Sequence, residues 1–212
     1  MGSENVVKKL MRFFRPRSVT VIGASTKPGK VGNAVLRNLI NGGFKGKIYP
    51  VNPKAKEILG LKVYNRIKDI PGEVDHAFIA IRADTIPDII PDLAEKNVPV
   101  AVVISSGFAE IGNHELQRKL VETARSYGIR IIGPNTYGVY CPPASLSSSF
   151  TIPYDYKGSL AVICQSGGVG MAALGYARIK RIGLSLNVGL GNMADLDHAD
   201  LLEYLGEDEY TK

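Results

Sequence analysis

The fold is decided by the stretch Ser18-Val19-Thr20-Val21-Ile22-Gly23-Ala24-Ser25-Thr26-Lys27-Pro28-Gly29-Lys30-Val31-Gly32. Its first five residues form a run rich in β-branched side chains that stops at Gly23, and a loop rich in Gly, Ser and Lys follows. The residues from about Lys30 onward have the apolar spacing of an amphipathic helix. This strand–loop–helix order is typical of a nucleotide-binding βαβ unit, whose backbone N–H groups and helix N-terminus bind phosphate.

The alternation of apolar runs and amphipathic segments continues for more than a hundred residues. Strands are predicted at Ser18–Ile22, Lys47–Val51, Asp75–Ile81, Pro99–Ser105 and Ile129–Ile132, and helices at 5–14, 30–41, 86–95 and 112–127. Strands that alternate with helices in this way predict a parallel sheet covered on both faces, which is a doubly wound α/β fold.

Small, polar or cationic residues follow four of these strands. They are Gly23-Ala24-Ser25, Asn52-Pro53-Lys54, Ser105-Ser106-Gly107 and Gly133-Pro134-Asn135. Ligands of doubly wound sheets bind at the carboxyl ends of the strands, so these residues are predicted to form one ligand-binding rim.

The first loop differs from a standard dinucleotide-binding loop. Ser25 replaces the second glycine of G-x-G-x-x-G, and Lys27 and Lys30 make the loop more cationic. The second strand ends in Asn52-Pro53-Lys54, where an NAD site carries Asp or Glu for the ribose hydroxyls. A cation at this position favours a ligand with a phosphate on its ribose, and both coenzyme A (CoA) and NADP have one.

The pattern changes after Tyr137 and then starts again. Prolines and serines over 142–157 predict a linker between a first domain, 1–141, and a second unit, 158–212. The second unit has predicted strands at Ser159–Cys164 and Leu184–Val188 and helices at 171–182 and 200–205. It is too small for an independent α/β domain, so we interpret it as truncated, with apolar surface at 184–188 and 201–205 exposed or paired with another copy.

A second anion site is predicted where the strand that ends at Cys164 meets the next helix. Ser166-Gly167-Gly168 place small residues at that helix N-terminus, whose free N–H groups and dipole attract a phosphate. The spacing of a nucleophile elbow is absent, so Ser166 is not predicted to be a catalytic nucleophile.

The composition excludes several classes of protein. The 212 residues carry a net charge of +6, but the basic residues are scattered, which argues against a nucleic-acid footprint. The two cysteines and three histidines have no metal-ligand spacing, so no metal site is predicted. No apolar run is long enough to span a membrane and no signal peptide is evident, so a cytoplasmic protein is expected.

Several motifs resemble a known family, the ADP-forming acyl-CoA (acetyl-CoA) synthetases, which are relatives of the succinyl-CoA synthetase α subunit. The motifs are Phe14 to Ser25, Ile131-Ile132-Gly133-Pro134-Asn135 with Gly138-Val139, Gln165-Ser166-Gly167-Gly168, and Gly189 to Asp197 followed by Asp200 to Leu205. They occur in order along nearly the whole chain. The resemblance implies a Rossmann-like CoA-binding domain followed by the start of a flavodoxin-like domain.

The resemblance also implies which residues bind CoA. The loop from Gly23 to Gly32, with Gly23, Ala24, Ser25, Lys27, Lys30, Val31 and Gly32, would hold the CoA phosphates. Asn52, Pro53 and Lys54 would flank the adenosine end, Ile81, Arg82, Ser105, Ser106 and Gly107 would border the adenine and pantetheine path, and Asn135 would lie near the thiol. Ser166, Gly167 and Gly168 would face a phosphohistidine.

The activity implied by the resemblance is the interconversion of acyl-CoA, ADP and phosphate with acid, CoA and ATP. The family's phosphorylated histidine would lie beyond Lys212, and ATP, ADP and Mg would bind to a nucleotide-grasp domain or subunit in a homo- or hetero-oligomer. This chain alone is therefore expected to bind CoA or acyl-CoA without turnover. Two alternatives stay open: an NADP-binding oxidoreductase domain, and a non-catalytic module that responds to CoA.

Overall fold

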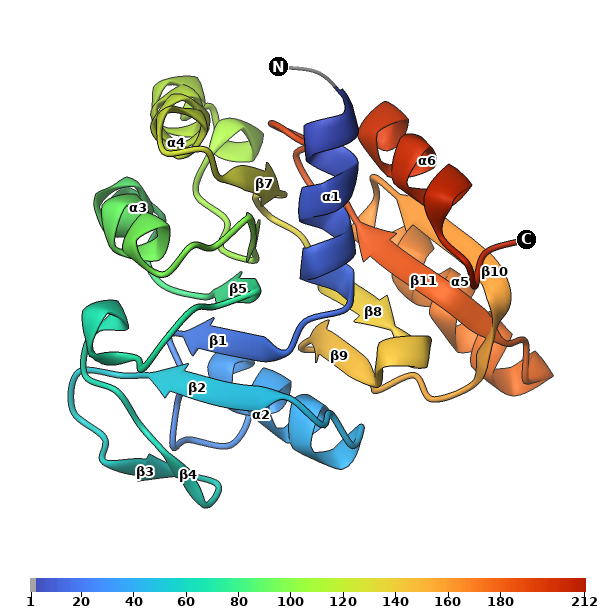
Figure 1. The fold of residues 1–212 in the computed structure, drawn as a ribbon, viewed down its shortest axis with the longest axis horizontal. Helices are drawn as coiled ribbons and strands as arrows, with labels where there is room; N and C mark the ends of the chain where they lie inside the picture. Colours follow the sequence, from blue (N-terminus) through green and yellow to red (C-terminus); the bar gives the residue numbers. More distant parts are fainter. Residues whose placement is uncertain (1–2) are drawn as a thin grey trace.

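A computed structural model describes residues 3–212, and its larger sheet is parallel (Figure 1). The strand order is β2-β1-β5-β6-β7. The strands are β1 (Ser18–Ile22), β2 (Lys47–Val51), β5 (His76–Ile79), β6 (Val100–Val103) and β7 (Arg130–Ile132). The helices between them are α2 (Val31–Asn41), α3 (Ile86–Glu95) and α4 (His114–Ser126), and a small hairpin, β3 (Glu57–Ile58) with β4 (Leu61–Lys62), follows β2. The predicted doubly wound α/β fold is confirmed.

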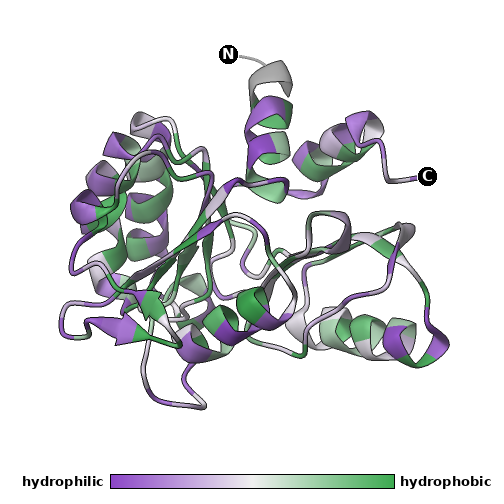
Figure 2. Ribbon diagram, turned by 60° about the horizontal axis from the view of Figure 1, so that its bottom comes forward, coloured by the Kyte–Doolittle hydropathy of each residue, from purple (hydrophilic) through white to green (hydrophobic). Residues whose placement is uncertain are grey.

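Helices cover both faces of this sheet because its strands are apolar on both sides. Phe78 and Val102 belong to a core cluster with residues of α1 and α2, whereas their neighbours Ala77 and Val103 belong to a cluster with residues of α3 and α4. Figure 2 shows the hydrophobic strands between helices whose outer faces are hydrophilic. The direction of winding changes between β1 and β5, which makes the crevice at their carboxyl ends the expected ligand site.

A second, mixed sheet has the order β10-β11-β8-β9. Its strands are β8 (Gly138–Cys141), β9 (Leu146–Ser149), β10 (Lys157–Cys164) and β11 (Leu184–Gly189), and its helices are α5 (Gly167–Lys180) and α6 (His198–Glu207). The sequence predicts a linker over 142–157, but the structure differs, because β9 lies in that segment and pairs with β8.

The serines of β9 explain why its sequence does not look like a strand. Ser148 and Ser149 are fully buried, and both have polar partners. Ser148 Oγ lies 2.7 Å from His76 Nε2, while Ser149 Oγ donates to the Tyr137 carbonyl at 2.6 Å. Asn38 of α2 donates to the Ser149 carbonyl at 2.7 Å. The serines therefore pack the second sheet against the first through hydrogen bonds rather than apolar contact.

The N-terminal helix α1 (Ser3–Phe14) joins the two sheets. Phe14 contacts Tyr204 of α6 with ring centroids 5.0 Å apart, and Arg15 forms an ion pair with Asp208 at 2.6 Å. Arg12 bonds to Asp75, the residue before β5. The basic residues near the N-terminus thus connect parts of the fold.

A loop of the second unit covers the free edge of β7. The N–H groups of Asn192, Ala194 and Leu196 donate to carbonyls of residues 134, 133 and 131, at 2.8, 3.0 and 3.1 Å. The Asp195 side chain between them is fully buried and accepts hydrogen bonds from Arg125 at 2.7 Å and from Arg130 at 3.0 Å. The two sheets consequently share one folded body.

The expectation of exposed apolar surface is wrong for β11. Leu184, Leu186 and Val188 are buried because β10 and β8 flank this strand. Leu201 and Tyr204 of α6 are buried as well. Leu202 of α6 is exposed, as the sequence predicts for part of 201–205, and further exposed apolar side chains lie on α5 at Val169, Tyr176 and Ile179 and on β10 at Leu160.

Candidate functional site

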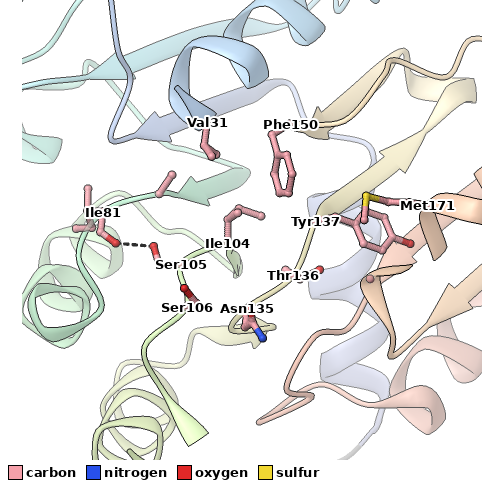
Figure 3. Close-up of a pocket in the computed structure, with 12 residues that line it drawn as sticks. Val31, Ile81, Ile104, Ser105, Ser106, Asn135, Thr136, Tyr137, Phe150 and Met171 are labelled. Carbon is pink, nitrogen blue, oxygen red and sulfur yellow. Dashed lines mark hydrogen bonds between the residues drawn. The ribbon is translucent and has the colours of Figure 1, made fainter. Parts of the chain in front are cut away.

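A pocket lies where the carboxyl ends of the parallel strands face the N-terminus of α5 (Figure 3). Its volume is about 420 Å³. The lining residues come from both sheets and are Val31, Ala80, Ile81, Ile104, Ser105, Ser106, Asn135, Thr136, Tyr137, Phe150, Gly167 and Met171. The structure therefore brings together six predicted site residues, namely Val31, Ile81, Ser105, Ser106, Asn135 and Gly167.

Gly32 lets helix α2 approach the end of strand β1 closely, and Gly23 lets that end approach the residue that follows β5. A Cβ on Gly32 would lie 2.0 Å from the Gly23 carbonyl oxygen, and a Cβ on Gly23 would lie 2.2 Å from the Ala80 carbonyl oxygen. The N–H groups of Gly23 and Ala24 both donate to the Val51 carbonyl at 3.2 Å, so they join the end of β1 to β2. The first turn of α2 has no side-chain cap, and only its Asn33 N–H donates to the Lys30 carbonyl, so the N–H groups of Val31 and Gly32 are left for an anion.

The predicted lysines lie outside the pocket lining. Lys27, Lys30 and Lys54 are exposed in the loops that follow β1 and β2. Asn52 fixes the backbone there, since its Nδ2 donates to the Ala24 carbonyl at 2.8 Å and its Oδ1 accepts from the Lys54 N–H at 2.9 Å. Asn52 thus ties the loop after β2 to the loop after β1, and it holds the backbone of Lys54 beside them.

Arg82 is engaged by a neighbouring carboxylate. It donates from Nε and from a terminal nitrogen to Asp84, at 3.1 and 2.5 Å, and both side chains are exposed. The hydrogen bonds from Arg82 lower the pKa of the Asp84 carboxyl. Arg82 would have to release Asp84 before it could bind a phosphate with the same nitrogens.

Hydrogen bonds join the loop after β6 to the loops after β5 and β7. Ser105 Oγ donates to the Ile81 carbonyl, and the Asn135 N–H donates to the Ser105 carbonyl at 3.0 Å. Asn135 has a φ of +58°, a left-handed conformation that Asn tolerates better than most residues. This conformation places the exposed Asn135 amide at the pocket rim.

Six lining residues were not predicted as site residues from the sequence: Ala80, Ile104, Thr136, Tyr137, Phe150 and Met171. Tyr137 is buried under the pocket, where its OH donates to Asn187 at 2.8 Å and burial raises its pKa. Thr136 donates to the Gly189 carbonyl at 2.6 Å. Phe150 follows β9 and Met171 lies in α5, so both reach the pocket through the packing of the second sheet. The one signal for this packing in the sequence is Gly170, a glycine within α5 that lies against the Tyr137 ring.

The N-terminus of α5 closes the pocket from the side of the second sheet. Ser166 is the N-cap, and its hydroxyl accepts from the Val169 N–H at 3.4 Å. Gly167 lines the pocket, whereas the exposed Gly168 does not. The partial positive charge of a fourteen-residue helix therefore faces the same space as Ser106 and Asn135.

The thiols do not have the character of nucleophiles. Cys141 is buried, and burial raises its pKa to about 11. Burial also raises the pKa of Cys164, the last residue of β10. Both thiols are protonated at neutral pH, whereas the thiolate is the nucleophilic form. Within residues 3–212, no group of His, Cys, Asp and Glu side chains is arranged to hold a metal ion, and no helix is long and apolar enough to cross a membrane.

Comparison with known families accounts for both sheets. Residues 17–142 match the family described as "CoA binding domain", which is more than half of the chain. The chain belongs to this CoA-binding domain family. Residues 157–212 match the "Succinyl-CoA ligase like flavodoxin domain". The first match includes β8, although β8 pairs within the second sheet. The CoA-binding domain therefore contributes one strand to the sheet of the flavodoxin-like unit.

Proteins similar to this CoA-binding chain are ADP-forming acetate–CoA ligases. The α subunit of ligase I from Pyrococcus furiosus is 47% identical over 96% of this chain and 45% of its own length. The ligase from Methanocaldococcus jannaschii is 44% identical over 93% of this chain and 28% of its own. The chain therefore spans less than half the length of these relatives.

A solved structure has the same arrangement. Acetyl-coenzyme A synthetase 1 of Ca. Korarchaeum cryptofilum, solved in complex with phosphate and ADP, superposes with a TM-score of 0.92 at 46% identity. The match covers 95% of this chain and 44% of that one. The predicted resemblance to ADP-forming acyl-CoA synthetases is confirmed, and the NADP-binding alternative is not favoured.

Proposed function

We propose that this chain binds CoA in the pocket between the two sheets, as the CoA-binding part of an ADP-forming acetate–CoA or related acyl-CoA ligase. The observation that carries the proposal is the shared pocket: strand ends of the CoA-binding domain and the N-terminus of α5 line one space. That ligase would interconvert acyl-CoA, ADP and phosphate with acid, CoA and ATP. A nucleotide-grasp domain or subunit would bind the nucleotide and Mg.

Each part of the site has a role in this proposal. The uncapped first turn of α2 and the cations Lys27 and Lys30 would bind the CoA phosphates. Lys54 would meet the ribose phosphate. Asn135 would lie near the thiol, and the N-terminus of α5 would attract the phosphoryl group that reacts with the acyl group.

Thermal unfolding with and without ligands tests the binding. A ligand that binds only the folded chain stabilises it by about 2.7 kcal/mol at a hundredfold excess over Kd. We expect CoA to raise the melting temperature and NADPH, which also carries a phosphate on its ribose, to leave it unchanged. An unchanged melting temperature in millimolar CoA would refute the proposal.

Lys54→Ala tests the placement of the ribose phosphate. We expect the affinity for CoA to fall about tenfold, because a hydrogen bond to a charged group contributes about 1.5–3 kcal/mol and this site is exposed. Dephospho-CoA lacks the phosphate and should bind both forms of the chain equally. Lys47→Ala is the control, because Lys47 is exposed at the opposite end of β2. Equal losses for CoA and dephospho-CoA in titration calorimetry would contradict the placement.

A further inference from the structure

Glu110 holds the loop that lines the pocket after β6. Its Oε1 accepts hydrogen bonds from the N–H groups of Gly107 and Phe108, the latter at 3.2 Å. These two residues directly follow Ser105 and Ser106, which line the pocket. The loop conformation therefore depends on a carboxylate in the short helical turn Ala109–Ile111.

Asn192 links this carboxylate to the second sheet. It lies in the loop between β11 and α6, and its Nδ2 donates to Glu110 Oε2 and to Gln117 Oε1, the latter at 2.9 Å. Its Oδ1 accepts from Asn135 Nδ2 at 3.3 Å, and its N–H donates to the Pro134 carbonyl at 2.8 Å. One amide therefore contacts both loops that carry the polar pocket residues.

The charge state of Glu110 agrees with this arrangement. Burial disfavours the ionised carboxyl, but hydrogen bonds from Asn192, Gly107 and Phe108 outweigh burial and lower the pKa of Glu110. The ionised carboxylate can only accept hydrogen bonds, so it orients the Asn192 amide with Nδ2 toward itself. The Oδ1 atom then faces Asn135, which fixes the side chain at the thiol end of the proposed site.

We infer that Asn192 and Glu110 form a positioning pair that holds Asn135 and the 105–108 loop in the arrangement that binds CoA. The inference rests on the proposed function and adds to it: a residue of the flavodoxin-like unit sets the geometry of the CoA-binding domain. Neither side chain lines the pocket, so both act through the residues that do.

Exchange of the two functional groups provides the test. Asn192→Asp places two carboxylates against each other, and Glu110→Gln places two amide N–H₂ groups against each other. The double variant, E110Q with N192D, reverses the direction of the bond, since a glutamine amide then donates to an aspartate. Both backbone N–H groups keep an acceptor, Asn135 keeps its acceptor too, and the Gln117 amide turns so that its Nε2 donates to the carboxylate introduced at position 192.

We expect each single variant to bind CoA about fivefold to tenfold more weakly and the double variant to bind within about twofold of the unchanged chain. In the absence of ligand, amide hydrogen exchange at Gly107 and Phe108 should become faster in the single variants and return to its original rate in the double variant. Asn97→Asp is the matched control, because Asn97 donates to Glu73 at 2.8 Å far from the pocket. It should lower the melting temperature without changing the affinity for CoA.

The outcomes separate the two proposals. Two results would overturn the positioning pair: unchanged amide hydrogen exchange at Gly107 and Phe108 in the single variants, or a double variant that binds CoA as weakly as they do. Faster exchange with unchanged affinity for CoA would overturn its role in binding. Failure of the unsubstituted chain to bind CoA would instead refute the proposed function, while the exchange measurements would still test the pair.

Discussion

His76 shows how one buried side chain can make stability depend on pH. Its ring is fully buried, stacked on Phe13 at 4.0 Å, with Nδ1 3.0 Å from the Phe13 carbonyl. A carbonyl only accepts, so Nδ1 carries the proton and Nε2 accepts from Ser148. Burial lowers the His76 pKa from 6.5 to about 4, and it outweighs the opposite effects of the Phe13 carbonyl and of Asp75.

The unfolded chain therefore binds a proton at His76 between about pH 6.5 and pH 4 that the folded chain does not. Stability is fully present above pH 6.5 and falls as the pH approaches 4, by on the order of 3 kcal/mol. Urea unfolding at several pH values measures this loss. We expect His76→Gln to remove the loss of stability between about pH 6.5 and pH 4, however stable that variant is at pH 7. His114→Gln, at an exposed histidine, should retain it. Parallel pH profiles for the unchanged chain and His76→Gln would contradict the assignment.

At the scale of elements, the contact of α2 with β1 constrains the loop between them, which we propose binds the CoA phosphates. Gly32→Ala would put a Cβ 2.0 Å from the Gly23 carbonyl, and backbone cannot move aside as a flexible side chain can. We expect a loss of about 1–3 kcal/mol of stability and weaker CoA binding, measured by thermal unfolding and calorimetry.

Gly175→Ala is the matched substitution within a helix. No atom lies within 4 Å of its added Cβ, and alanine is favoured over glycine in a helix by about 1 kcal/mol. It should leave CoA binding unchanged and stabilise the chain. Equal effects of the two alanines would show that the approach of α2 to β1 does not constrain the loop.

The elements that the sequence predicts well are those whose pattern is local. The apolar runs of β5 and β6 and the amphipathic spacing of α3 and α4 are visible in any short window of sequence. β9 is not, because its buried Ser148 and Ser149 have partners that are distant in sequence, such as His76 and Asn38. The site divides in the same way: Ser105, Asn135 and Gly167 follow strands and were predicted, whereas Phe150 and Met171 reach the pocket only through packing of the second sheet.

At the scale of the whole molecule, one core cluster extends through both sheets. It contains Phe14 of α1, Val102 of β6, Val188 of β11 and Tyr204 of α6. We therefore expect the chain to unfold in a single transition, with coincident urea curves from far-ultraviolet and tyrosine circular dichroism.

A shortened chain tests the same expectation. Residues 1–142 contain the matched CoA-binding domain, but they lack the β11 and α6 partners of β8 and α1. This fragment should have a lower midpoint than the whole chain. Two separate transitions in the whole chain, or a fragment of equal stability, would show that the two units fold independently.

The buried Asp195 carboxylate has a consequence for how such chains change in evolution. Asp195 lies in the loop between β11 and α6, whereas its partners are Arg125 of α4 and Arg130 of β7, in the CoA-binding domain. Loss of the arginines would leave a buried charge unpaired, and loss of the aspartate would leave Arg130 without its principal partner. These positions should therefore covary among relatives. Recombination between distant relatives would succeed only where the donor and acceptor genes agree at residues 125, 130 and 195, so the two matched segments are inherited as a pair.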